Sequence, residues 1–250
     1  MSGHSKWSTI KRKKAKEDQK RGKIFSKLIK EITVAARLGG GDPETNSRLR
    51  QAIDDANDEN MPKDNIEKAI QRGTGELPGV TYEDMTYEGY GPNGTALFIE
   101  CTTDNKNRTV SELRHILDKH EGSLGESGSV AWVFERKGVV YVSKDGVTED
   151  DLMLSAIDHG AEAITEEDEF FELTCPMTDF HNLKTGLEDA GFEIEDSELQ
   201  QIPKNNVPVT GSDAKKLMRL LEALEDHDDV QNVWSNADIE EETLAETEAS

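Results

Sequence analysis

The sequence predicts an α+β protein with three parts, and three patterns support this class. Apolar side chains recur at helical spacing between residues 24 and 78, and strand and helix signals alternate between 138 and 202. A second alternating set flanks that segment on both sides. We therefore expect a three-helix N-terminal domain followed by two α/β domains, one inserted in the other. The predicted bounds are 24–78 for the helical domain, 79–136 plus 204–236 for the outer α/β domain, and 137–203 for the inserted domain.

The helical domain is predicted from three short amphipathic segments. The first helix rests on apolar positions at helical spacing and ends at "GGGDP": Ile24, Leu28, Ile32, Ala35 and Leu38. The second is expected from about 45 to 59. The third should run from Pro62, which suits a first helical position, to Arg72, with Gly73 as its C-terminal cap.

Strand and helix signals dominate after residue 79. "MTYEGYGPNGTALFIECTT" predicts two strands around a turn at Gly91 to Gly94, followed by a helix, a glycine-serine loop and a strand "VAWVFE". Residues 138–202 then follow the order β-α-β-β-α-β, which is the ferredoxin-like split unit. A strand "NNVPVT", a helix and a strand "DVQNVWSN" complete a second such set, so we expect both α/β domains to be ferredoxin-like. The acidic tail, 237–250, is predicted to be disordered.

Charge is divided very unevenly along the chain. The 250 residues have a formal net charge of -23, yet residues 1–38 hold twelve Lys and Arg against three acidic residues. That segment therefore carries +9, and the remainder carries -32. Such a division favours binding of a polyanion by the basic part, since the acidic remainder would repel phosphate. We define the basic arm as residues 1–23 and expect it to be mobile when unbound.

The basic arm and the helix behind it supply the candidate nucleic-acid-binding residues. The predicted phosphate contacts are Lys6, Lys11, Arg12, Lys13, Lys14, Lys16, Lys20, Arg21, Lys23, Lys27 and Lys30. His4 and Trp7 could stack on bases, or Trp7 and Ile10 could pin the arm to the helices. Arg108, at the start of a predicted helix, is a further candidate. The alternative is a solvated tail, or a contact between the arm and the protein's own acidic domains.

Other motifs favour structural interpretations. The glycines at 89, 91 and 94 indicate a hairpin turn, because a P-loop would need a following Lys-Ser/Thr. Cys101 and Cys175 are expected to be buried, inert thiols. The acidic runs "EEDE" and "EDHDD" are expected to be solvated edges. We find no catalytic constellation, metal ligand set or cofactor motif, so the sequence favours a non-enzymatic binding protein.

Nothing in the sequence identifies a base-reading element. The three-helix segment could be similar to a DNA-reading module, but its second helix carries "DDANDEN", which a major groove would repel. No run predicts a membrane span, and the basic start lacks the apolar core of a signal peptide, so we expect a soluble, cytoplasmic protein without a membrane partner. DNA and RNA both remain as polyanion partners.

The sequence resembles the YebC/PmpR family, whose relatives include mitochondrial translational activators of cytochrome oxidase. The resemblance rests on "SGHSKW", "KRGKIFSKLIKEI", "AARLGGGDPETNSRLR", "YEGYGPNGTALFIECTTDNKNRT" and "GSVAWVFE", and it extends from Ser2 to about Ser235. It implies a helical domain plus two α/β domains, and a DNA-binding transcriptional regulator. It also implies an alternative, a ribosome-associated translation factor that binds ribosomal RNA and relieves stalls on proline-rich stretches. A third possibility is an enzyme that uses a cleft between the α/β domains.

Overall fold

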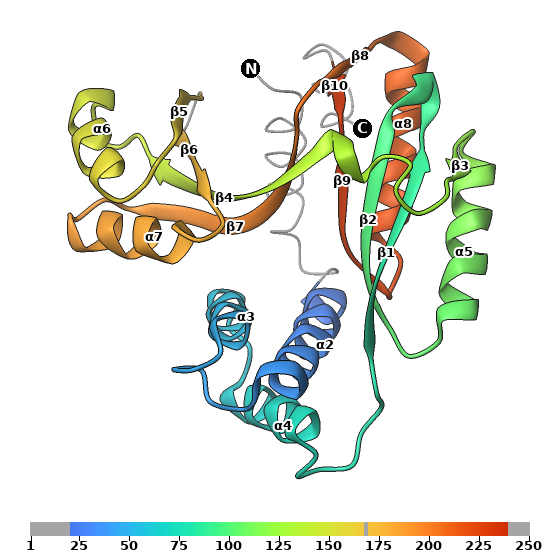
Figure 1. Ribbon diagram of the computed structural model, residues 1–250, viewed down its shortest axis with the longest axis horizontal. Coiled ribbons are helices and arrows are strands. Elements are labelled where there is room, and N and C mark those ends of the chain that lie inside the picture. The colour runs from blue at the N-terminus through green and yellow to red at the C-terminus, as the bar shows by residue number, and fades with distance from the viewer. Residues whose placement is uncertain (1–20, 168–169, 240–250) are drawn as a thin grey trace.

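The computed structural model describes residues 21–167 and 170–239, which form a helical domain and two α/β domains (Figure 1). The two α/β domains lie on either side of Figure 1, and the helical domain lies below and between them. Two long strands, β4 (Phe134–Ser143) and β7 (Ile194–Pro203), join the α/β domains. The predicted α+β class, with a helical domain ahead of two sheet domains, is confirmed.

The helical domain packs three helices around an apolar core: α2 (Arg21–Gly39), α3 (Ser47–Asp58) and α4 (Lys63–Thr74). The last three residues assigned to the basic arm therefore already belong to α2. Asn46 caps α3 by accepting the N–H of Leu49 at 3.1 Å, and its amide donates to the carbonyls of Ala35 and Gly40 at 2.8 Å each. One side chain thus fixes the end of α2 against the start of α3.

Gly73 does not cap α4, contrary to the prediction. The helix continues to Thr74 and ends at Gly75, which has a positive φ of 85°. A Cβ at Gly73 would lie 2.7 Å from the Cβ of Ala36 and would also collide with the carbonyl of Thr33. This glycine therefore permits the close approach of α2 and α4.

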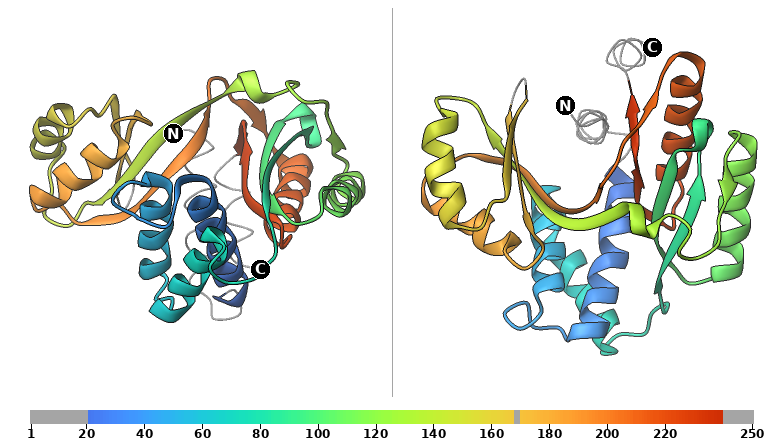
Figure 2. Two further views of the ribbon diagram at one scale, coloured as in Figure 1. Left: turned by 60° about the horizontal axis from the view of Figure 1, so that its bottom comes forward. Right: turned by 45° about the horizontal axis from the view of Figure 1, so that its top comes forward.

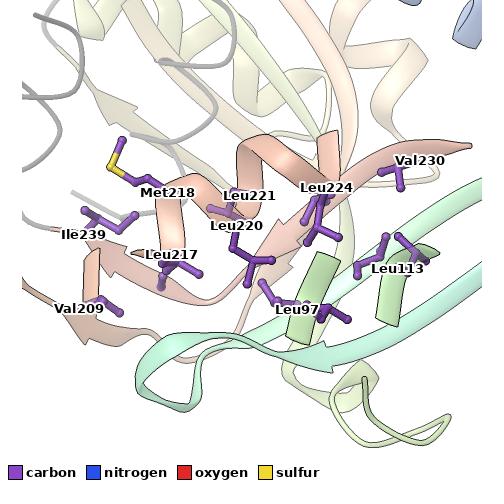
Figure 3. Close-up of a cluster of buried hydrophobic side chains, with 14 of the residues drawn as sticks. Leu97, Leu113, Val209, Leu217, Met218, Leu220, Leu221, Leu224, Val230 and Ile239 are labelled. Carbon is purple, nitrogen blue, oxygen red and sulfur yellow. The ribbon is translucent and has the colours of Figure 1, made fainter. Parts of the chain in front are cut away.

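The outer α/β domain has a four-stranded antiparallel sheet with the order β3-β1-β2-β9. Its elements are β1 (Glu83–Tyr90), β2 (Ala96–Thr103), α5 (Lys106–Lys119), β3 (Ser123–Leu124), α8 (Gly211–Glu225) and β9 (Val230–Ser235). The predicted turn between β1 and β2 is confirmed, with Asn93 and Gly94 at positive φ. Leucines of α8 pack on Leu97 of the sheet and Leu113 of α5 (Figure 3).

The inserted domain has the predicted ferredoxin-like order. Its elements are β4, α6 (Glu149–Asp158), β5 (Ala163–Glu166), β6 (Phe170–Pro176), α7 (Phe180–Asp189) and β7. The sheet order is β5-β6-β4-β7, so the first strand lies between the third and the fourth, and neighbouring strands are antiparallel.

Two strand predictions for the outer domain are wrong. Residues 131–133 of "VAWVFE" form a short 3-10 helix, and the strand that follows, β4, belongs to the inserted sheet. The place in the outer sheet that was predicted for "VAWVFE" is taken by β1, which pairs with β2. The segment "NNVPVT" contains β8 (Val207–Val209), which pairs in parallel with β10 (Ala237–Ile239) outside the main sheet.

The predicted disordered tail also starts too early. Ala237 and Ile239 are buried in the outer core, and three residues are too few to show a strand period in sequence. Residues 240–250 lie outside the described residues. None of the described helices combines the length and the apolar composition that a membrane-spanning helix needs.

Candidate nucleic-acid interface

Most of the predicted phosphate-binding side chains lie in residues 1–20, outside the part of the chain that the structure describes. They are Lys6, Lys11, Arg12, Lys13, Lys14, Lys16 and Lys20, together with His4 and Trp7. Arg21 is the first residue of α2. The structure therefore describes the base of the basic arm, where Lys23, Lys27 and Lys30 follow on α2, and it places Arg108 nearby on α5.

The three lysines at the base of the arm bind the end of α8. They are spaced four and three residues apart, so they share one face of α2. Each donates to a backbone carbonyl: Lys23 Nζ to Asp226 at 3.1 Å, Lys27 Nζ to Glu225 at 2.8 Å and Lys30 Nζ to Asp228 at 2.8 Å. Carbonyls at a helix C-terminus lack helical partners and carry partial negative charge, so cations stabilise them. The structure thus gives these three candidates an anchoring role within the chain.

Asp229 is the centre of this contact, and its side chain is only 4% exposed. Its Oδ1 accepts from Lys30 Nζ at 2.9 Å, and its Oδ2 accepts from Arg108 Nη2 at 2.7 Å. The hydroxyls of Thr109 and Thr103 lie 2.9 and 3.2 Å from Oδ2. Burial alone would raise the pKa of Asp229, but the bonds from Arg108, Lys30 and Thr109 outweigh it and hold that pKa well below its usual range. We call these five residues the Asp229 network.

The expectation that "EDHDD" is a solvated edge is wrong for its last residue. Asp226 and Asp228 are exposed, but Asp229 is buried among donors from α2 and α5. The donors are distant in sequence, so no local pattern predicts the bonds that Asp229 accepts. The local feature that separates Asp229 from Asp226 and Asp228 is its position directly before the apolar strand β9.

Arg108 also binds within the chain. Asn105 caps α5 by accepting the N–H of Arg108 at 3.1 Å. The guanidinium lies between Asp104, at 2.8 Å, and Asp229, and hydrogen bonds to Asp229 and then Asp104 raise its pKa. With 42% of its side chain exposed, Arg108 links the network to the surface of α5.

Glu112, His227 and Asp229 bring potential metal-ligating atoms within 4.8 Å of one another. Hydrogen bonds already engage these atoms. The N–H of Asp229 donates to His227 Nδ1 at 3.1 Å, so the neutral ring carries its proton on Nε2, which lies 2.8 Å from Glu112 Oε2. Both imidazole nitrogens are occupied, and the Asp229 carboxylate is shared by two cations. We assign this group a structural role.

Sequence reasoning missed Glu88, which fixes an exposed loop. This carboxylate on β1 is 6% exposed and accepts the backbone N–H groups of Gly128, Val130 and Ala131 at 2.6, 2.6 and 2.7 Å. Burial raises its pKa, but these three bonds outweigh burial and lower it. The loop carries Trp132, which is 67% exposed. A polar strand residue gives no sequence signal for such a role.

The two cysteines are buried and free, as predicted. Burial raises the pKa of Cys101 to about 12 and that of Cys175 to about 11, so both stay as unreactive thiols at neutral pH.

The fold and the contact between α2 and the end of α8 define a three-domain α+β protein. Its basic N-terminal segment is attached, through α2, to acidic α/β domains. Comparison with family models assigns residues 5–76 to the TACO1/YebC protein N-terminal domain and residues 82–237 to the TACO1/YebC second and third domain. The chain belongs to the TACO1/YebC family.

Relatives of similar length carry regulatory names. The chain is 56% identical over 245 residues to a probable transcriptional regulatory protein of Desulfotalea psychrophila, with 98% of each chain covered. It is 53% identical over 246 residues to one of Chlorobaculum tepidum, with the same coverage. It is also similar to the crystal structure of a conserved hypothetical protein from Aquifex aeolicus, with a TM-score of 0.83, 46% identity, and 91% of this chain and 94% of that chain covered.

Proposed function

We propose that this chain is a non-enzymatic, nucleic-acid-binding regulator of gene expression that acts in the cytoplasm and contacts the DNA backbone through its basic arm. The observation that supports this most directly is the charge division, +9 in residues 1–38 and -32 in the rest. The regulatory names of the relatives agree with it.

The contacts of α2 with the end of α8 support different roles for the basic residues. Lys23, Lys27 and Lys30 fix α2 to the body, so the basic residues ahead of them extend from a fixed base. Phosphate binding is therefore assigned mainly to the arm from Lys6 to Arg21. Such contacts give affinity without reading sequence, because phosphates are the same at every base pair.

Duplex binding measured by fluorescence anisotropy across a salt series tests this function. The variant Lys11→Ala, Arg12→Ala, Lys13→Ala and Lys14→Ala should bind more weakly, and its slope of log K against log salt should be shallower by about three to four, at about 0.9 per lost contact. A matched control removes four exposed basic residues elsewhere: Lys63, Arg114, Lys119 and Lys204. Equal losses in both variants would mean that net charge, and not the arm, governs binding.

A ribosome-associated translation factor is the second candidate function. The acidity of α3, with Asp54 and Asp58, favours it, because a helix that enters a DNA groove should not carry this charge. In this proposal the arm binds ribosomal RNA and the acidic body faces basic ribosomal proteins. Co-sedimentation with 70S particles at low salt, lost in the four-residue arm variant, is the expected result. A protein that stays at the top of the gradient contradicts this candidate.

A further inference from the structure

Helix α6 of the inserted domain has apolar side chains on two sides. Leu152 and Ala156, four residues apart, are buried against the sheet. Leu154 and Ile157 lie on the solvent side and are 75% and 61% exposed, and Met153 beside them is 38% exposed. A helix at the surface of a globular protein normally has polar side chains on its solvent side. Packing within the domain therefore explains only one of the two apolar sides of α6.

The other described helices differ from α6 in this respect. Helix α7 packs beside α6 on the same face of the sheet, and its exposed side chains are polar: His181, Asn182, Glu188 and Asp189. Among the described helices, α6 alone exposes more than one large apolar side chain. In Figures 1 and 2, α6 lies at the outer edge of the inserted domain, away from the helical domain and the outer α/β domain. Neither of those domains covers it.

The surroundings of this apolar surface are acidic. On a helix, the neighbours of a residue lie three and four positions away. For Leu154 these neighbours are Ile157 and three exposed aspartates, Asp150, Asp151 and Asp158, none of which forms an ion pair with a described residue. The segment 145–183 holds twelve Asp and Glu and no Lys or Arg. We call the following residues the α6 face: Met153, Leu154, Ile157, Asp150, Asp151 and Asp158.

We propose that the α6 face binds a basic amphipathic segment of another protein. Such a segment places apolar side chains on Leu154 and Ile157 and places lysines or arginines beside the aspartates, so it complements both parts of the face. A nucleic acid does not fit, because its phosphates would meet three carboxylates. The acidic body of a second copy does not fit either, because it brings further negative charge to the same surface.

Helix α6 is held at both ends, so the face is already formed before a partner binds. At its start, the Thr148 hydroxyl accepts the N–H of Asp151 at 3.3 Å. At its end, Asn182 Nδ2 on α7 donates to the carbonyl of His159 at 3.1 Å. The His159 ring packs against Gly186 of α7, where a Cβ would collide with it. A preformed face loses less conformational entropy when it binds a partner.

Binding of a protein at the α6 face would make the chain selective, and this consequence rests on the proposed function. The basic arm is assigned to phosphates, which are the same at every position of a nucleic acid. A chain that binds a nucleic acid through its arm and a basic protein through α6 binds most tightly where both partners occur together. The second contact thus selects a location that the arm cannot recognise.

Fluorescence anisotropy with labelled synthetic helices tests the binding chemistry. The first peptide has leucine at helical spacing on one side and lysine at the other positions. A second peptide replaces its leucines by alanine, and a third replaces its lysines by glutamate. At physiological salt the full chain should bind the leucine-lysine peptide about tenfold more tightly than either of the others, because each of these lacks one part of the complementary surface.

Variants of the α6 face locate the binding site of the leucine-lysine peptide. Leu154→Ser with Ile157→Ser should weaken binding about tenfold, and Asp150→Asn with Asp158→Asn should also weaken it. All four side chains are exposed, so both variants should keep the fold, which circular dichroism checks.

Matched controls change the same kinds of side chain elsewhere. Leu38→Ser with Val80→Ser removes two apolar side chains that are 66% and 52% exposed, and Glu188→Gln with Asp189→Asn neutralises two exposed carboxylates of α7. Both control variants should bind the peptide as the wild type does. Equal affinities in the α6 and control variants would overturn the proposal, and so would a wild-type chain that does not bind the leucine-lysine peptide.

Photo-cross-linking in cells tests the class of the natural partner. Benzoylphenylalanine in place of Leu154 forms a bond with the molecule that contacts α6, and mass spectrometry identifies the bonded segment. We expect protein segments in which Lys and Arg flank apolar residues, and Asp150→Asn with Asp158→Asn should remove these bonds. Bonds to nucleic acid, or bonds only to this chain or its copies, would contradict the proposal.

The four-residue arm variant separates this inference from the proposed function. It should bind the leucine-lysine peptide at least as tightly as the wild type does and lose affinity for duplex DNA, whereas Leu154→Ser with Ile157→Ser should have the opposite effects. Peptide binding through α6 in a chain whose intact arm does not bind the duplex supports the inference and contradicts the proposed function. Duplex binding through the arm, with peptide binding that does not depend on α6, contradicts the inference alone.

Discussion

Replacing Asp229 by Asn should loosen the attachment of the helical domain to the outer α/β domain. The carboxylate accepts charged hydrogen bonds from Lys30 on α2 and Arg108 on α5, and its side chain is only 4% exposed. The amide keeps the shape and one acceptor oxygen but removes the charge. Lys30, whose side chain is 13% exposed, then keeps a largely buried charge without its anionic partner.

The expected loss is about 2–4 kcal/mol in the free energy of unfolding. A hydrogen bond to a charged group contributes about 1.5–3 kcal/mol, and removing one member of a buried ion pair costs about 3–5 kcal/mol. The bond to Arg108 contributes less to this loss of stability, because the Arg108 side chain is 42% exposed and water can solvate it. A double-mutant cycle with Lys30→Met should return a coupling of about 1–2 kcal/mol.

Urea denaturation followed by circular dichroism measures the loss, and amide exchange of α2 shows whether the helical domain is released first. The pKa of Asp229 is lowered in the folded protein, so its contribution is present above the unfolded value of about 3.9 and is lost as pH falls through the folded pKa. The difference in the free energy of unfolding between wild type and variant should therefore be constant from about pH 5 to 7 and shrink below about pH 4.

Asp228→Asn is the matched control. Its side chain is exposed, and Lys30 uses only its backbone carbonyl, so stability should change by less than about 0.5 kcal/mol. A loss below about 1 kcal/mol for Asp229→Asn, or one that equals the control, would refute the assigned role of the network.

Three further substitutions test other parts of the structure. Glu88→Gln should destabilise the protein by about 2–3 kcal/mol in urea denaturation, because a neutral amide cannot replace the carboxylate that accepts three backbone N–H groups. Burial raises the pKa of Asp55 to about 7, so wild-type stability should fall as pH rises from about 4 to 8. Asp55→Asn should therefore raise the melting temperature at pH 8 and leave it unchanged at pH 4. Gly73→Ala should lower the melting temperature, since its Cβ would lie 2.7 Å from that of Ala36, whereas Gly22→Ala, with open space around it, should leave it unchanged or raise it.

The parts of the fold that were predictable are those whose signal is local. The three helices and the inserted domain follow from periodicity within one continuous segment, and their order is correct. The outer domain is split by the insertion, so its strand pairing depends on contacts between distant segments. The pairing of β8 with β10 is an example: each strand has three residues, too few for a period to emerge.

The candidate interface was predictable in its charge but not in its contacts. The excess of basic residues ahead of α2 is visible in composition alone. The roles of Lys30 and Arg108 depend on Asp229, which is 199 and 121 residues away in sequence. Glu88 likewise looks like any polar strand residue until the loop at 128–131 folds onto it. Whether a carboxylate is buried depends on contacts between segments that are distant in sequence, so the sequence alone does not identify its donors.

The sequence separation between Lys30 and Asp229 also determines when, during synthesis, α2 can attach to the outer α/β domain. A ribosome that adds about 5–20 residues each second needs roughly 10–40 s to proceed from one residue to the other. During that time the helical domain has no partner at the end of α8, because that helix has not been synthesised. A nascent chain, or a product of premature termination before residue 225, therefore carries the basic start on an unattached helix. Only the finished polypeptide contains the end of α8 to which α2 binds. The attachment of α2 is therefore a late step, which can occur only when synthesis has reached the C-terminal strands.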